Sequence, residues 1–60
     1  MTVYFLVKYP YHGKKVDVQA VIEPDRIVSE NSDSITFGYD GSNHTSTIAK
    51  SDILTIETED

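Results

Sequence analysis

Apolar side chains alternate with polar ones along three segments of this 60-residue chain. Successive side chains of a β-strand point to opposite faces of a sheet, so a period of two indicates strands that bury one face. No window repeats apolar residues at helical spacing without also fitting a strand. We therefore expect an all-β protein. The alternating positions are Val3, Phe5, Val7 and Tyr9, then Val16, Val18, Ala20 and Ile22, then Ile35, Phe37 and Tyr39.

Prolines, glycines and polar clusters divide the chain into five to six short strands. Pro10 has no backbone N–H to donate to a ladder and is expected to end the first strand. Gly13 marks the turn of a first hairpin. Asp40 and Gly41 mark a second hairpin, whose loop is expected to be longer than two residues. The expected strands cover residues 2–9, 15–23, 26–29, 34–40, 45–49 and 54–58.

A chain of this length forms one small β domain, residues 1–60. Residues 50–53 interrupt the alternation, and we expect a single 3₁₀ turn there, before the last strand, that Ser51 or Asp52 could cap. In length and strand order the chain resembles the small SH3-like and Sm-like barrels. The resemblance implies such a barrel or a bent antiparallel meander. It rests on no sequence motif and so carries over no functional residues. The expected core is Val3, Phe5, Val7, Val18, Ala20, Ile22, Ile27, Ile35, Phe37, Ile48, Ile53 and Ile56.

The chain has no cysteine, which excludes disulfides and zinc sites built on cysteine. Its first apolar run, residues 3–7, has no basic segment before it and no small-residue cleavage site after it, which is not the pattern of a signal peptide. No segment approaches the roughly 20 apolar residues of a membrane span. We therefore expect a cytoplasmic protein with no membrane partner.

Charge is divided unequally along the chain. Residues 1–28 carry a net charge of +1 and residues 29–60 a net charge of −6, for a total of −5. Binding to a phosphate backbone needs clustered lysine and arginine, so this balance argues against nucleic acid as a partner.

Nothing in the sequence predicts catalysis, a metal site or a cofactor. The only two side chains that could act as a neutral-pH base, His12 and His44, both fall in expected turns. A carboxylate pair such as Asp40 and Asp52 is conceivable, but ten acids on so short a chain produce such pairs by chance. A domain this small also has little concave volume from which to exclude water. We expect a protein that is not an enzyme.

Tyrosines and lysines near the hairpin tips suggest a binding surface. Tyr9, Tyr11 and Tyr39 keep the core-facing parity of their strands beyond the part expected to be buried. Exposed tyrosine among basic side chains is typical of surfaces that bind other proteins or stack bases. The main expectation is thus a non-enzymatic binding or accessory module that acts through contacts with another protein. The candidate surface is Tyr9, Tyr11, His12, Lys14, Lys15 and Tyr39.

Two alternatives stay open. The acidic half could imitate the charge of nucleic acid and inhibit a nucleic-acid enzyme, as an inhibitor encoded by a mobile element would. Its candidate face is Glu30, Asp33, Asp40, Asp52 and Glu57. The second alternative is an Sm-like oligomer that binds nucleic acid, because small barrels with open edges gain stability by pairing them. Self-association into a homo-oligomer therefore stays open as well.

Overall fold

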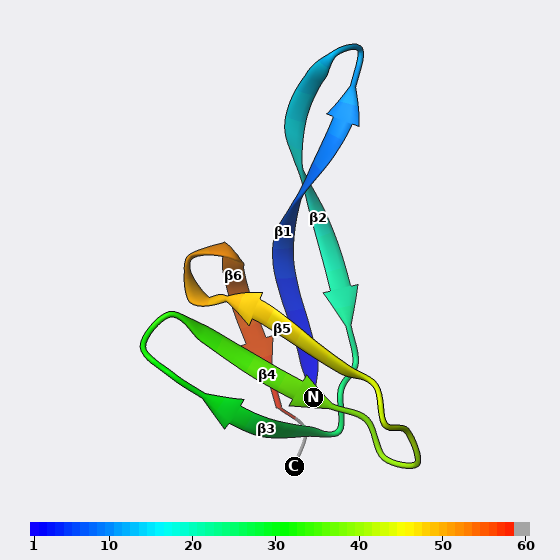
Figure 1. Ribbon diagram of the computed structural model, residues 1–60, viewed down its shortest axis with the longest axis vertical. Coiled ribbons are helices and arrows are strands. Elements are labelled where there is room, and N and C mark those ends of the chain that lie inside the picture. The colour runs from blue at the N-terminus through cyan, green and yellow to red at the C-terminus, as the bar shows by residue number, and fades with distance from the viewer. Residues whose placement is uncertain (59–60) are drawn as a thin grey trace.

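The computed structural model describes residues 1–58, and these form an all-β antiparallel meander (Figure 1). This confirms the expected fold class and the expected number of five to six short strands. The elements within the described residues are β1 (Thr2–Tyr11), β2 (Lys14–Ile22), β3 (Arg26–Glu30), β4 (Ser34–Gly38), β5 (Thr45–Ala49), the 3₁₀ helix η1 (Lys50–Asp52) and β6 (Ile53–Glu57).

The strands form two three-stranded sheets, in the orders β2-β1-β6 and β3-β4-β5. In Figure 1 the second sheet lies across the lower half of the first, and the hairpin of β1 and β2 continues beyond it. Across residues 1–58, no strand of one sheet pairs with a strand of the other. The bent meander is therefore confirmed, whereas the barrel, the other expected form, is not closed.

The β1–β2 hairpin is much longer than the pairing that ties it to the rest of the sheet. Its register runs without a break from Val3 opposite Ile22 to Tyr11 opposite Lys14. The pairing of β1 with β6, by contrast, covers only residues 2–5. We call residues 6–19 the arm and the other described residues the body. The radius of gyration, 12.7 Å, exceeds the roughly 10 Å expected for a compact chain of this length because the arm projects.

Pro10 lies inside β1 and pairs with Lys15, so the prediction that it ends the first strand is wrong. Tyr11 and Lys14 flank a two-residue turn, and such a flanking pair is hydrogen-bonded. Antiparallel pairs alternate between bonded and non-bonded, so Pro10 and Lys15 form a non-bonded pair. Pro10 therefore lacks an N–H on the edge of β1 that points away from β2, and the pairing of β1 with β2 loses no hydrogen bond.

The core lies between the lower half of the first sheet and the second sheet. Val3, Ile35, Phe37 and Ile48 are buried there. Partly buried side chains pack around these four, namely Met1, Phe5, Ile22, Ile53 and Ile56.

Three residues expected in the core are exposed, so that part of the prediction is wrong. Val7, Val18 and Ile27 are exposed to 38%, 40% and 46%. The two valines belong to the arm, which extends past the second sheet and has no opposing layer. An alternating apolar position therefore indicates a buried side chain only where a second layer packs on that part of the sheet.

The 3₁₀ turn is confirmed at η1, but the predicted side-chain cap is wrong. Ala49 occupies the position that precedes the turn, and no side chain caps it. The backbone N–H of Lys50 instead donates to the Asp33 carbonyl at 2.8 Å. The loop between β3 and β4 of the second sheet therefore holds the start of this turn.

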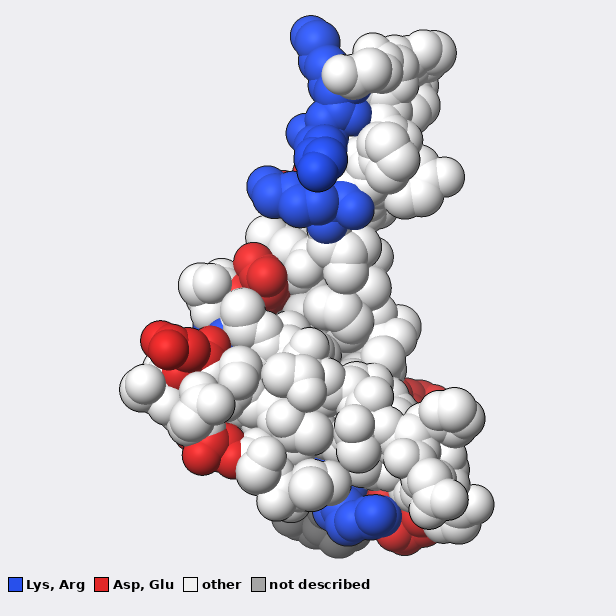
Figure 2. All heavy atoms as spheres, in the orientation of Figure 1, with Lys and Arg blue, Asp and Glu red and all other residues white. Residues whose placement is uncertain are grey.

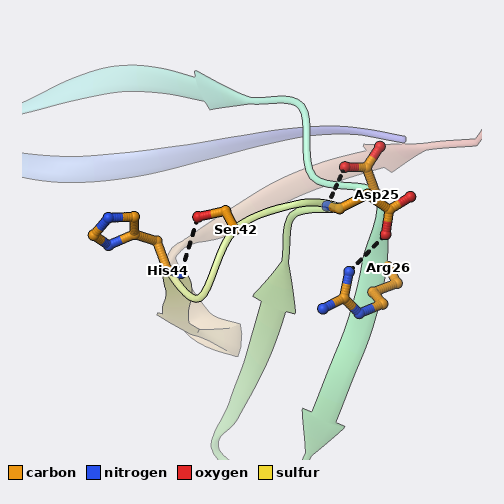
Figure 3. A network of polar contacts seen from close by, with 5 residues as sticks. Asp25, Arg26, Ser42 and His44 are labelled. Carbon is orange, nitrogen blue, oxygen red and sulfur yellow. Dashed lines mark hydrogen bonds and ion pairs between the residues drawn. The ribbon is translucent and has the colours of Figure 1, made fainter.

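A small polar network ties β3 to the loop after β4 (Figure 3). The backbone N–H of Asp40 donates to the Asp25 carboxylate at 2.7 Å, and Arg26 Nη1 lies 2.7 Å from Asp40 Oδ1. Within the same loop, the His44 N–H donates to the Ser42 hydroxyl at 3.0 Å. The loop spans residues 39–44, which confirms that it is longer than two residues. These contacts fix the end of the molecule opposite the arm.

Candidate functional site

The arm carries an apolar face that the described residues leave uncovered. Because the β1–β2 register is unbroken, odd-numbered residues of β1 share a face with even-numbered residues of β2. In the body this face packs in the core, and in the arm it continues into solvent. Its five large side chains are exposed to between 38% and 59%. We call this set the arm face: Val7, Tyr9, Tyr11, Val16 and Val18.

The other side of the arm is polar and positively charged. Lys8 and Asp17 lie opposite each other in the register and form an ion pair. The hydrogen bond to Asp17 and then its charge raise the pKa of Lys8 above its ordinary value, with a smaller contribution from Asp52. Lys15 lies on this side as well, next to Pro10. Figure 2 shows most of the visible cationic side chains along one side of the arm.

The charge of the molecule is therefore polarised along its length. The arm carries Lys8, Lys14 and Lys15 against Asp17, a net charge of +2, whereas the rest of the chain carries −7. Most of the acidic side chains visible in Figure 2 lie on the body, below the arm. A partner approaching the arm meets a positive end on an acidic protein.

The tip of the arm is a tight turn with a defined shape. His12 and Gly13 both have positive φ, 50° and 77°, as a type I′ turn requires at its two central positions. The His12 ring lies edge-on to Tyr11, with ring centroids 4.2 Å apart. This contact holds the Tyr11 side chain at the end of the arm face.

Five of the six residues predicted as a binding surface lie on the arm. They are Tyr9, Tyr11, His12, Lys14 and Lys15. Tyr39 is the exception: it follows β4, is half-buried, and its hydroxyl lies 3.0 Å from the Ser46 hydroxyl. In Figure 1 the loop after β4 and the arm tip lie at opposite ends of the molecule. Tyr39 therefore lies in the loop after β4, beside the second sheet, and not on the arm.

The sequence prediction missed three residues of the arm face, because Val7, Val16 and Val18 fit the pattern of the core. One signal could have separated them. The expected strands of the first hairpin were eight and nine residues long, whereas the two strands predicted at 26–29 and 45–49 were shorter. Strands of this excess length can extend beyond a facing sheet of shorter strands and leave their ends uncovered.

The five acidic candidates come from different elements, and two of them form ion pairs. They come from β3, from two loops, from η1 and from β6. Glu30 forms an ion pair with Lys50 and Asp40 one with Arg26, each at 2.7 Å. Asp33, Asp52 and Glu57 have no ion pair within residues 1–58. Hydrogen bonding to Glu57, and then its charge, raises the pKa of Tyr4 above its ordinary value.

A groove of about 260 Å³ lies where the arm leaves the body. Phe5, Leu6 and Val7 of β1 line one side of it, and residues 47–49 of β5 line the other. Three charged side chains also line the groove, namely Lys8, Asp17 and Asp52. The groove thus borders the edge of β1 at the point where β6 stops pairing with it.

Between residues 1 and 58, no three His, Asp or Glu side chains lie close enough together to hold a metal ion. The same residues include no helix long and apolar enough to cross a membrane. No family model, curated protein or solved structure matches the chain.

Proposed function

We propose that this protein is a non-enzymatic binding module and that it binds another protein through the arm face. The observation that carries the proposal is the exposure of Val7, Tyr9, Tyr11, Val16 and Val18 on a projecting hairpin. A contiguous exposed apolar surface on a small protein marks an interaction site more often than scattered apolar residues do. Tyrosine supplies large contact area at low conformational cost and is enriched at binding hot spots.

The charge of the arm defines the kind of partner surface. Lys14 lies opposite Tyr11 in the register and so shares the arm face, and Lys15 follows it on the other side of the hairpin. A partner with an apolar centre and acidic side chains around it complements this arrangement, and the attraction accelerates encounter. The lysines cluster too sparsely, on a chain of net charge −5, to favour nucleic acid in place of protein.

The inhibitor alternative has less support from the same contacts. A nucleic-acid mimic needs a row of unpaired carboxylates, and Glu30 and Asp40 are paired with Lys50 and Arg26. High salt separates the two proposals, because an apolar contact resists salt and a charge mimic does not.

The test is affinity capture of partners by the full chain and by Tyr9→Ser with Tyr11→Ser. Removal of two hot-spot side chains costs at least about 2 kcal/mol, so we expect capture to fall by at least about thirtyfold. Val21→Thr is the matched control, since Val21 is exposed on the opposite face of the first sheet. Equal capture by the double variant and the wild type, both folded by circular dichroism, would rule the arm face out.

A further inference from the structure

We infer that the outer edge of β2 in the arm is a self-association site, at which two copies of the chain pair antiparallel and form a dimer with two-fold symmetry. The two arms together then make one four-stranded sheet. The inference goes beyond the proposed function and does not rest on it, because the edge of β2 and the arm face are different surfaces.

The arm lacks what a hairpin needs in water. Two antiparallel strands alone are marginally stable, and a third strand or an opposing layer is needed to hold them. Among the described residues, β6 pairs with β1 only over residues 2–5, and the exposure of the arm face shows that no layer covers the arm. A strand added from another molecule supplies the missing third strand.

Of the two edges of the arm, the edge of β1 is poorly suited to an added strand. The 3₁₀ helix η1 lies beside β1 at the base of the arm. Nearer the tip, Pro10 has no N–H to donate. Between these two limits, only Lys8 has an N–H that points away from β2. A single N–H is too little for a ladder.

The outer edge of β2, by contrast, is open and regular. It is the outermost strand of its sheet within residues 1–58. Lys14 forms a bonded pair with Tyr11 across the turn, and bonded and non-bonded pairs alternate from there. Lys15 and Asp17 therefore point their N–H and C=O groups away from β1. Because β2 has no proline and no break in its register with β1, an added strand can form a regular ladder here.

Charge makes this edge complementary to itself. Lys15 and Asp17 are two residues apart and lie on the same side of β2. With the two-fold axis at Val16, each Lys15 lies directly opposite the Asp17 of the other copy. A lysine on an edge strand ordinarily deters pairing, but opposite charges that face each other across two strands stabilise it.

The neighbouring registers do not have this match. An axis at Asp17 sets two carboxylates against each other, which is destabilising. An axis at Val18 places Asp17 opposite Gln19 and leaves Lys15 without an acidic partner. The axis at Val16 is therefore the register that we infer.

This register also joins the two arm faces. Residues that lie opposite each other in an antiparallel pair point to the same side of the sheet, so the two Val16 side chains are neighbours and Lys14 lies beside Val18 of the other copy. The stem of Lys14 covers apolar surface while its ammonium group stays in water. Because both copies use the same edge, the assembly closes as a dimer and presents an arm face of double width.

The test is amide hydrogen exchange by NMR over a dilution series of the full chain, with sedimentation equilibrium alongside. Pairing of residues 14–18 makes a small interface, so we expect a weak dimer that forms at about 100 µM. The amides of Lys15 and Asp17 should exchange at least about tenfold more slowly in the dimer than in the dilute monomer. The amide of Val21 is the control, since it points from the same edge of β2 outside the pairing and should not change.

A cysteine cross-link tests the register, because the chain has no cysteine of its own. The two Val16 residues form a non-bonded pair with Cα atoms about 4.5 Å apart, which suits a disulfide. Val16→Cys should therefore form a disulfide dimer under mild oxidation. Val18→Cys is the matched control, since Val18 is 40% exposed against 39% for Val16, and it should stay largely reduced. Faster cross-linking of Val18→Cys would contradict the charge match and overturn the inference.

A proline on the edge of β2 tests the ladder. Asp17 forms a non-bonded pair with Lys8, so Asp17→Pro removes an outward N–H without loss of a β1–β2 hydrogen bond, and it should abolish the dimer. Gln19→Pro is the matched control, because it removes an outward N–H beyond the paired residues and should leave the dimer intact. If Asp17→Pro does not fold, Lys15→Glu replaces it, because it sets like charges opposite each other and should also dissociate the dimer.

Three outcomes would overturn the inference. The first is a wild-type chain that stays monomeric at about 100 µM, the concentration at which a weak interface is occupied. The second is a folded Asp17→Pro variant that dimerises as tightly as the wild type. The third is loss of the dimer in the Tyr9→Ser and Tyr11→Ser double variant, which would assign self-association to the arm face. A dimer that this double variant keeps while it loses protein capture supports both proposals separately.

Discussion

Gly38 has no room for a larger side chain. It is buried in β4, and a Cβ there would lie 2.7 Å from Val28 Cγ2 and 3.2 Å from Arg26 Cζ. Gly38→Ala must displace both side chains, and with them the contact between Arg26 and Asp40. We expect the free energy of unfolding, measured by urea denaturation, to fall by about 1–3 kcal/mol.

The control for Gly38→Ala is an exposed position on the neighbouring strand. Ser29 lies on β3 and is exposed, so Ser29→Ala should stay within about 0.5 kcal/mol of the wild type. An unchanged urea midpoint for Gly38→Ala would contradict the close packing of β3 on β4.

Tyr4 should titrate at a higher pH than an ordinary tyrosine. Its hydrogen bond to Glu57 favours the neutral phenol, so the pKa is raised, and the resulting stabilisation is present below the unfolded-state pKa. That stabilisation is lost as the pH rises through the folded-state pKa. Glu57→Gln removes the charge and should lower the pKa of Tyr4, as followed by NMR across the alkaline range. Identical titration of Tyr4 in the two proteins would show that Glu57 does not contact it.

Arm and body should differ sharply in their contribution to stability. Ile48 is buried at the centre of the core, and Ile48→Ala should cost about 2–5 kcal/mol, much of what a domain this small possesses. Val16 projects from the arm into solvent, so Val16→Thr should change the free energy of unfolding by about 0.5 kcal/mol or less. Thermal and urea unfolding of the two variants measure the difference. A comparable loss in both would mean that the arm folds back onto the body.

The elements were predictable where a local rule decided them. Alternation located the strands, and Gly13, Gly41 and the residues around Ser51 located two turns and the 3₁₀ helix. The errors arose where a segment distant in the sequence determines the local structure. The backbone of Asp33 and not a side chain holds the start of η1, and the edge that Pro10 faces depends on the register of the whole hairpin.

The candidate site was predictable in composition but not in extent. Tyr9 and Tyr11 were correctly expected at a hairpin tip. Tyr39 has the same alternating pattern, yet it follows a strand of the other sheet, because the pattern does not indicate which sheet a strand joins. Val7 and Val18 look like core residues in the sequence. They are exposed because the second sheet ends before it reaches them.

At the scale of the whole molecule, the fold separates the core from the exposed arm. The core is confined to the crossing of the two sheets, and the long hairpin extends a molecule of 39 × 24 × 24 Å (Figure 1). The positive arm projects from an acidic body. Side chains on the arm can therefore change without unfolding the body, which is the arrangement expected of a module that presents a binding element.

The central claim is that the arm face is the surface that meets a partner protein. The most direct measurement is site-specific photo-cross-linking in the native host, with p-benzoylphenylalanine at Tyr9, at Tyr11 and, as the control on the opposite face, at Val21. We predict one protein adduct, the same from Tyr9 and Tyr11 and absent from Val21. Adducts of equal yield from all three positions, or an adduct from Val21 alone, would contradict the claim.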